Sequence, residues 1–132
     1  MNSLKTQTRV RWIELEGKKV LLMEFAGAPV AESLQMIVDF DREMQGRAPA
    51  SVMMLTDVTG AQYDPSIARQ WKEARNRHDA VVRVSAMAGL SGLVGIAIRS
   101  FIEVRRFLGM SASNEPKVFE RIEDAREWLG RQ

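Results

Sequence analysis

The sequence predicts an α/β fold: a mixed β-sheet that opens with an antiparallel hairpin and has helices packed on its faces. The chain begins with two β-rich runs around a glycine turn, and then alternates short apolar runs with segments of helical period. Its 132 residues are 45% hydrophobic, which suits one domain over residues 1–132 with one core.

The hairpin is expected over residues 10–25. Residues 10–15 and 19–25 are β-rich, and Glu16, Gly17 and Lys18 form the turn between them. Pro29 then begins a helix that ends at Gly46. The apolar residues expected on its inward face are Val30, Leu34, Ile37, Phe40 and Met44.

The middle of the chain predicts two buried strands around a helix. Residues 51–57 form a short strand, and residues 80–89 form a central strand buried on both faces. Between them Asp64 supplies an N-cap and Pro65 the first helical residue. The residues expected on the inward side of this helix are Ile67, Trp71, Ala74 and His78.

A third helix is expected over residues 91–108, a short strand over 117–119 and a closing helix after it. The inward positions of the closing helix are Ile122, Ala125, Trp128 and Leu129. Since Trp71 and Trp128 take inward positions, both are expected to be structural. The resulting order ββαβαβαβα requires right-handed crossovers between the parallel strands of one sheet.

Composition excludes several classes of function. Nineteen basic and 17 acidic residues give a net charge of +2, which does not favour nucleic-acid binding. The absence of cysteine excludes disulfides and a cysteine nucleophile, and the single histidine supplies no metal site, so no cofactor is expected. The apolar stretch over residues 86–98 is too short to span a bilayer. Without a leader at its start, the chain is expected to be cytoplasmic.

Charge is distributed unevenly. Residues 29–63 carry five acids and two bases, whereas residues 64–78 carry four bases and two acids. Two solvated helix faces of opposite sign explain this pattern most simply, and the alternative is self-association or an anionic ligand. For self-association, the acidic face expected to meet the basic helices of a second copy consists of Glu32, Asp39, Asp41 and Glu43.

Three segments resemble the SpoIIAA-like family, which is grouped with STAS domains, the anti-sigma-factor antagonists, and more loosely with CRAL-TRIO lipid-transfer domains. They are residues 56–60 (TDVTG), 84–93 (VSAMAGLSGL) and 118–129. The resemblance covers nearly the whole chain from about Val10 and implies a STAS-like fold. Much of this family looks like bacterial proteins of unassigned function.

STAS antagonists carry a phosphorylatable serine at the start of the helix after the third strand. The matching stretch keeps Asp64 and Ser66 but has Pro65 and Ile67 in place of the usual neighbours. The resemblance therefore implies a phosphorylation or anion site at Ser66, with Asp57 and Thr59 nearby. The alternative is that Asp64 caps the helix and Ser66 is a polar residue of the first turn.

A second loop, containing Gly89, Ser91 and Gly92, follows the central strand and is a candidate ligand loop. A tight glycine turn with Ser91 as N-cap is the alternative. The carboxyl ends of parallel strands share one edge of a sheet, so this loop and residues 57–66 are expected to meet.

Asp57 does not match the phosphoacceptor of a response-regulator receiver, because such a domain opens β-α with a pair of acids after its first strand. We expect Asp57 to tie its own loop through side-chain hydrogen bonds to the backbone. His78, the one candidate base, has no nucleophile elbow to serve and is expected to contact free carbonyls at the end of its helix.

The third predicted helix has more apolar residues than one inward stripe needs. Leu93, Ile96 and Ile102 are therefore expected to form a homodimer contact, or to be covered by a neighbouring helix or loop. The sequence favours a non-enzymatic STAS-like module that binds a protein partner. The alternatives are a carrier of a small apolar or lipid-like ligand and, third, an enzyme.

Overall fold

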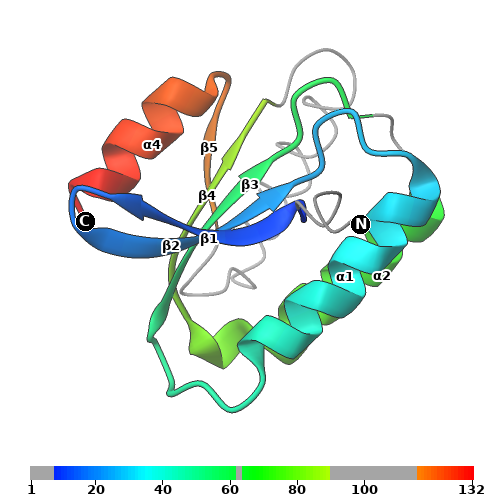
Figure 1. Ribbon diagram of the computed structural model, residues 1–132, viewed down its shortest axis with the longest axis horizontal. Helices are drawn as coiled ribbons and strands as arrows, with labels where there is room; N and C mark the ends of the chain where they lie inside the picture. Colours follow the sequence, from blue (N-terminus) through cyan, green and yellow to red (C-terminus); the bar gives the residue numbers. More distant parts are fainter. Residues whose placement is uncertain (1–7, 62–63, 90–115) are drawn as a thin grey trace, which may run out of the picture.

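The computed structural model describes residues 8–61, 64–89 and 116–132. They form a five-stranded sheet with α1 and α2 on one face and α4 on the other (Figure 1). In chain order the elements are β1 (Val10–Leu15), β2 (Lys18–Glu24), α1 (Val30–Met44), β3 (Val52–Asp57), α2 (Pro65–Arg77), the 3₁₀ helix η2 (Asp79–Val81), β4 (Val82–Ala88), β5 (Lys117–Phe119) and α4 (Ile122–Gly130).

The strands lie in the order β1-β2-β3-β4-β5. β1 pairs antiparallel with β2, and every other neighbouring pair is parallel. The predicted mixed sheet with its opening hairpin is therefore confirmed.

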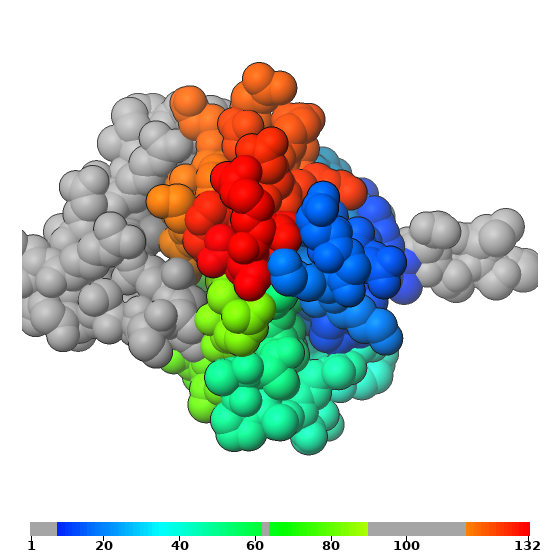
Figure 2. All heavy atoms as spheres, turned by 90° about the vertical axis from the view of Figure 1, so that its left-hand side faces the viewer, coloured from blue at the N-terminus to red at the C-terminus, as the bar shows by residue number. Residues whose placement is uncertain are grey.

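The hairpin turn explains the glycine at position 17. Glu16 and Gly17 both have positive φ angles, 52° and 80°, which is the conformation of a two-residue turn matched to the twist of the strands. Lys18 Nζ donates a hydrogen bond to the carbonyl of Gly130 at 2.7 Å. The tip of the hairpin thus lies against the carboxyl end of α4, as Figure 2 shows for the blue and red segments.

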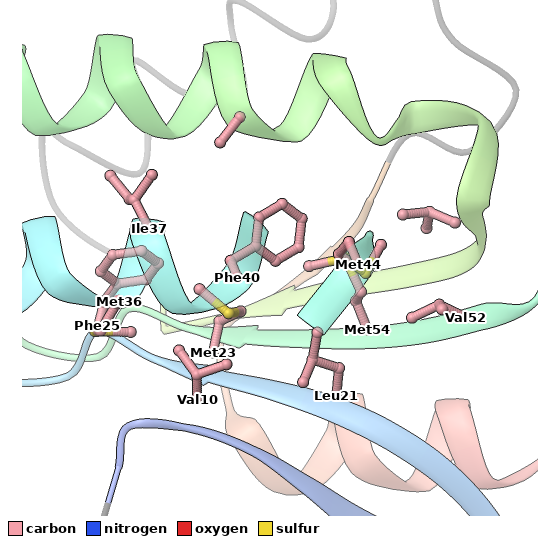
Figure 3. Packing of buried hydrophobic residues seen from close by; sticks show 12 residues of the cluster. Val10, Leu21, Met23, Phe25, Met36, Ile37, Phe40, Met44, Val52 and Met54 are labelled. Atoms are coloured by element: carbon pink, nitrogen blue, oxygen red, sulfur yellow. The ribbon is translucent and has the colours of Figure 1, made fainter. Parts of the chain in front are cut away.

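The core on the α1 and α2 face is built from large side chains. Phe40 is fully buried between the two helices (Figure 3), and its ring lies 4.7 Å from that of Trp71 in an edge-to-face arrangement. Phe25, from the end of β2, meets the same indole at 5.4 Å. Trp71 is half-buried, so it is a structural residue with one exposed side.

The inward face of α1 differs from the prediction at two positions. Val30 and Leu34 are 50% and 37% exposed. The helix also begins one residue later than expected, because Pro29 is the N-cap. The buried residues of α1 are Ser33, Met36, Ile37, Phe40 and Met44. The apolar arc of α1 is wider than the surface the fold covers, so part of it faces outward.

The predicted central strand is shorter than expected and less buried. Residues 79–81 form η2, so the strand begins at Val82. Arg83, at the register shift between β3 and β4, is exposed, so the predicted burial fails at this residue. Ser85 and Ala86 point to opposite faces of the sheet and are both buried, so burial on both faces holds further along the strand. The central position is confirmed, since β4 pairs with both β3 and β5.

The other face carries α4. Ala125 and Leu129 are fully buried against the sheet, while Trp128 is half-buried and its ring lies 5.8 Å from that of Phe119. The short strand at 117–119 is confirmed. The predicted third helix over residues 91–108 lies outside the described residues.

Candidate functional site

The end of β3 carries a closed hydrogen-bonded loop. Asp57 Oδ1 accepts hydrogen bonds from the backbone N–H of Thr59 at 3.0 Å and from its hydroxyl at 2.6 Å. The carboxylate therefore ties its own loop, as predicted. The backbone N–H of Val58 donates to the carbonyl of Ala88 at 2.9 Å, so this loop is also joined to the end of β4.

The loops after β3 and β4 meet at Gly89, as their shared edge predicted. Gly89 has a φ of +93°, and a Cβ atom placed on it would overlap the hydroxyl and backbone nitrogen of Thr59. Glycine is thus required here both by its backbone angle and by the close approach of the neighbouring loop. Ser91 and Gly92, the other residues of the candidate ligand loop, lie outside the described residues.

The start of α2 is capped from within the chain. Asp64 Oδ1 accepts hydrogen bonds from the backbone N–H groups of Ser66 at 2.9 Å and Ile67 at 3.0 Å, and Pro65 is the first helical residue. Two of the donors that could hold an anion are therefore already occupied by a carboxylate. An external anion at this position would have to compete with Asp64.

Ser66 lies on the outside of this first turn. Its side chain is exposed, and its hydroxyl accepts a hydrogen bond from Gln70 Nε2 at 3.2 Å. Within the described residues no hydrogen bond joins Ser66 to Asp57 or Thr59. Of the three residues predicted to form one site, Asp57 and Thr59 are thus hydrogen-bonded to each other, and Ser66 lies apart from them in the first turn of α2.

His78 has a different partner from the one predicted. It is the C-cap of α2, but its Nε2 lies 2.9 Å from Asp41 Oδ1 of α1 instead of contacting free helix carbonyls. Its ring also packs edge-to-face on Phe40 at 5.5 Å. Because Arg77 donates to the other oxygen of Asp41 at 2.8 Å, both ends of this carboxylate hold α1 and α2 together.

The acidic face predicted on the first helix is neutralised within the chain. Besides Asp41, each acid has a basic partner: Glu32 pairs with Arg9, Asp39 with Arg42 and Glu43 with Arg47. Glu43 also accepts a hydrogen bond from the indole of Trp12, on which Arg47 stacks. The acids of this face thus already have basic partners within the chain, and the contact of this face with the basic helices of a second copy stays a prediction.

The carboxyl end of α2 contains a shielded arginine. Burial lowers the pKa of the Arg75 guanidinium, and the charge of Asp79, 3.3 Å away, opposes that effect. The pair joins the last turn of α2 to η2. It therefore stabilises the entry into β4 and lies at the far end of α2 from Ser66.

A shallow hollow lies beside the start of β1. Its lining is mostly polar and consists of Thr8, Arg9, Arg11, Glu24, Ala26 and Glu32. Both arginines are paired with glutamates, Arg9 with Glu32 and Arg11 with Glu24. Such a surface does not suit an apolar or lipid-like ligand.

The described residues contain no group of three or more metal-ligating side chains. Within the same ranges no helix is long and apolar enough to cross a membrane. The predicted dimer residues Leu93, Ile96 and Ile102 lie outside the described part of the chain.

Sequence reasoning missed one surface. Val30, Leu34 and Val38 are the large hydrophobic side chains that the described part of the chain exposes, and all three belong to α1. Their spacing of four residues signals one stripe on the helix, but spacing alone does not tell which of two neighbouring stripes faces the sheet.

Solved structures of other proteins have a similar architecture. No family model and no curated protein matches the chain. Among solved structures, it is similar to an uncharacterized protein of the DUF3478 family with a SpoIIAA-like fold from Shewanella loihica PV-4. That match has a TM-score of 0.65 and 18% identity and covers 91% of each chain.

The chain is also similar to an anti-sigma-factor antagonist (STAS) domain protein from Planctomyces limnophilus. Here the TM-score is 0.56 and the identity 14%, over 93% of this chain and 98% of the other. At these identities the likeness concerns the fold, and it agrees with the order of strands and the opening hairpin seen here. The protein therefore has a SpoIIAA-like fold of the kind found in STAS domains.

Proposed function

We propose that this protein is a non-enzymatic STAS-like regulatory module that binds another protein at the edge where β3 and β4 end and α2 begins. One observation carries the proposal. Ser66 is exposed in the first turn of α2, at the position where the STAS antagonists it resembles carry their phosphorylatable serine. The loops beside it are held in place by the Asp57–Thr59 hydrogen bonds and the close approach of Gly89.

Phosphorylation at Ser66 would change this edge without any movement of the sheet. The positive end of the helix dipole would stabilise the phosphate. The phosphate would also lie close to the carboxylate of Asp64, which already accepts hydrogen bonds from the backbone N–H groups of Ser66 and Ile67. The added negative charge would therefore alter the surface offered to a partner. A module that responds to modification needs only this local change in charge.

An enzymatic role finds no support in the position of His78. This histidine lies at the opposite end of α2 from Ser66, about 18 Å away along a helix that rises 1.5 Å per residue. Its ring is held by Asp41 and Phe40. It therefore cannot act as a general base for Ser66.

The proposal is tested by capture on the immobilised protein from a bacterial lysate, with the bound proteins quantified by mass spectrometry. We compare the parent with Ser66→Glu and with Ser51→Glu as the matched control. Ser51 is also exposed but precedes β3, at the opposite end of the sheet. A kinase or anti-sigma-like protein that binds the parent and the control, but is lost with Ser66→Glu, supports the proposal.

Two results would contradict this function. Equal capture of every bound protein by the parent and by Ser66→Glu would show that the α2 edge is not a binding surface. The second result would come from native mass spectrometry of the purified protein. A bound acyl or isoprenoid compound in stoichiometric amount would indicate that the protein carries an apolar ligand instead.

A further inference from the structure

The outward surface of α1 carries an isolated apolar stripe. Val30, Leu34 and Val38 are 50%, 37% and 51% exposed and lie at positions i, i+4 and i+8 of the helix. Single exposed hydrophobic residues are common on protein surfaces, but here all the large ones in the described ranges gather on one helix. Such a concentration indicates a surface that is covered in the functional state.

The stripe is complementary to itself. A valine lies four residues before Leu34 and another four residues after it. If two copies of α1 cross antiparallel about a two-fold axis at Leu34, the leucines meet each other and Val30 of each copy meets Val38 of the other. A two-fold contact requires this property, because each surface must fit its own image.

The charges around the stripe allow such a contact. The acids of α1 are already paired within the chain, so two copies of this helix would not repel each other strongly. Arg69, exposed in the amino-terminal half of α2, makes no ion pair within the described residues. An antiparallel second copy brings the carboxyl-terminal half of its α1, with Asp39, towards that half of α2.

The stripe also begins beside the proposed partner edge. α1 and α2 pack against each other, with α2 largely behind α1 in Figure 1, and the Asp41–Arg77 ion pair gives their relative register. Both helices run antiparallel to the strands, so counting back eleven residues from each side of this pair brings Val30 level with Ser66. A second copy on the stripe would therefore lie next to Ser66.

We propose that a second copy of this chain docks on the α1 stripe, antiparallel and with its two-fold axis at Leu34. Three side chains per copy bury much less than the roughly 800 Å² per partner of a stable interface. The adjoining exposed residues of α2 must add to the contact, and we expect a dimer that dissociates on dilution. This proposal is independent of the function proposed above.

Sedimentation velocity over micromolar to millimolar protein concentrations tests the dimer. Leu34→Glu should weaken self-association by about a hundredfold or more, because each dimer would bury two unpaired carboxylates. Arg126→Glu is the control, since Arg126 is exposed on α4, which covers the opposite face of the sheet. Circular dichroism and thermal unfolding confirm that both variants remain folded.

Three outcomes would overturn this surface. If the parent stays monomeric at millimolar concentration, the proposed dimer does not exist. If Leu34→Glu dimerises like the parent, α1 does not take part in the dimer contact. If Ile102→Glu dissociates the dimer and Leu34→Glu does not, the contact lies in the segment that the sequence favoured instead.

Cysteine pairing tests the antiparallel geometry directly, because the chain contains no cysteine of its own. Under mild oxidation Val30→Cys and Val38→Cys proteins should form a disulfide when mixed, and neither should do so alone. Leu34→Cys should form a disulfide with itself. Disulfide-linked dimers of Val30→Cys with itself, without a mixed disulfide between Val30→Cys and Val38→Cys, would show a parallel or unrelated contact.

Discussion

The two faces of the sheet are packed by different means. The α1 and α2 face is covered by helices of 15 and 13 residues through large side chains, among them Phe25, Phe40, Trp71 and four methionines. The other face is covered by α4, which has nine residues. Its buried cluster combines Ala86 and Ala88 of β4 and Ala125 of α4 with Met53 and branched aliphatic residues, and Phe119 and Trp128 pack at its side. A short helix has little surface to bury, so it gains stability by close approach, whereas the longer pair fills a deeper layer.

This difference predicts that the two faces fail in different ways. A layer filled by a few large rings loses most when one of them is truncated, because a large cavity remains. A layer built on alanine loses most when a side chain is enlarged, because no space is left for it.

The largest effect is expected from Phe40→Ala. Phe40 is completely buried and contacts both Trp71 and His78, so we expect a loss of about 3 to 5 kcal/mol in the free energy of unfolding. Leu34→Ala on the same helix is the control and should cost about 1 kcal/mol, since Leu34 is 37% exposed. Chemical denaturation measures both. Equal losses would mean that the ring does not fill the layer between the helices.

Trp71 and Trp128 are both half-buried and lie on opposite faces of the sheet, so they allow the faces to be compared with one kind of side chain. Among the described residues, Trp71 meets two aromatic rings and Trp128 meets one. We expect Trp71→Ala to cost about 2 to 3 kcal/mol and Trp128→Ala about 1 to 2 kcal/mol, both below the range for a fully buried ring. Denaturant midpoints of the two variants, measured side by side, give the order. If Trp128→Ala lost more unfolding free energy than Trp71→Ala, the α4 face, and not the α1 and α2 face, would depend more on its large ring.

The order of elements could be predicted because its signals are local. Gly17 in the hairpin turn and the Asp64–Pro65 start of α2 act within a few residues of themselves, and each occurs where the sequence placed it. The short strand at 117–119 and the buried positions Ala125 and Leu129 followed from period alone. Such signals depend on the chain's own neighbours and not on how the elements pack.

The side-chain partners could not be predicted because they are distant in the sequence. The His78–Asp41 contact joins residues 37 positions apart, and it exists only because α1 and α2 pack side by side. The outward position of Leu34 depends on the same packing. For the candidate site, the edge shared by Thr59 and Gly89 followed from strand direction, and the Asp64 cap followed from the local sequence. The separation of Ser66 from the Asp57–Thr59 pair could not be predicted, because it depends on the path of the connection between β3 and α2.

The smallest expected effect tests close approach on the α4 face. Ala125 is fully buried where α4 meets the sheet, so Ala125→Leu must push the helix outward or force strained rotamers. We expect a loss of about 1 to 2 kcal/mol in the free energy of unfolding. Ala68→Leu makes the same change at an exposed position of α2 and should change stability by less than about 0.5 kcal/mol. Since leucine and alanine are both good helix formers, helix propensity cannot produce the difference. If Ala125→Leu were neutral or stabilising, the layer beneath α4 would contain unfilled space, and the alanines at 86, 88 and 125 would not be what brings this helix close to the sheet.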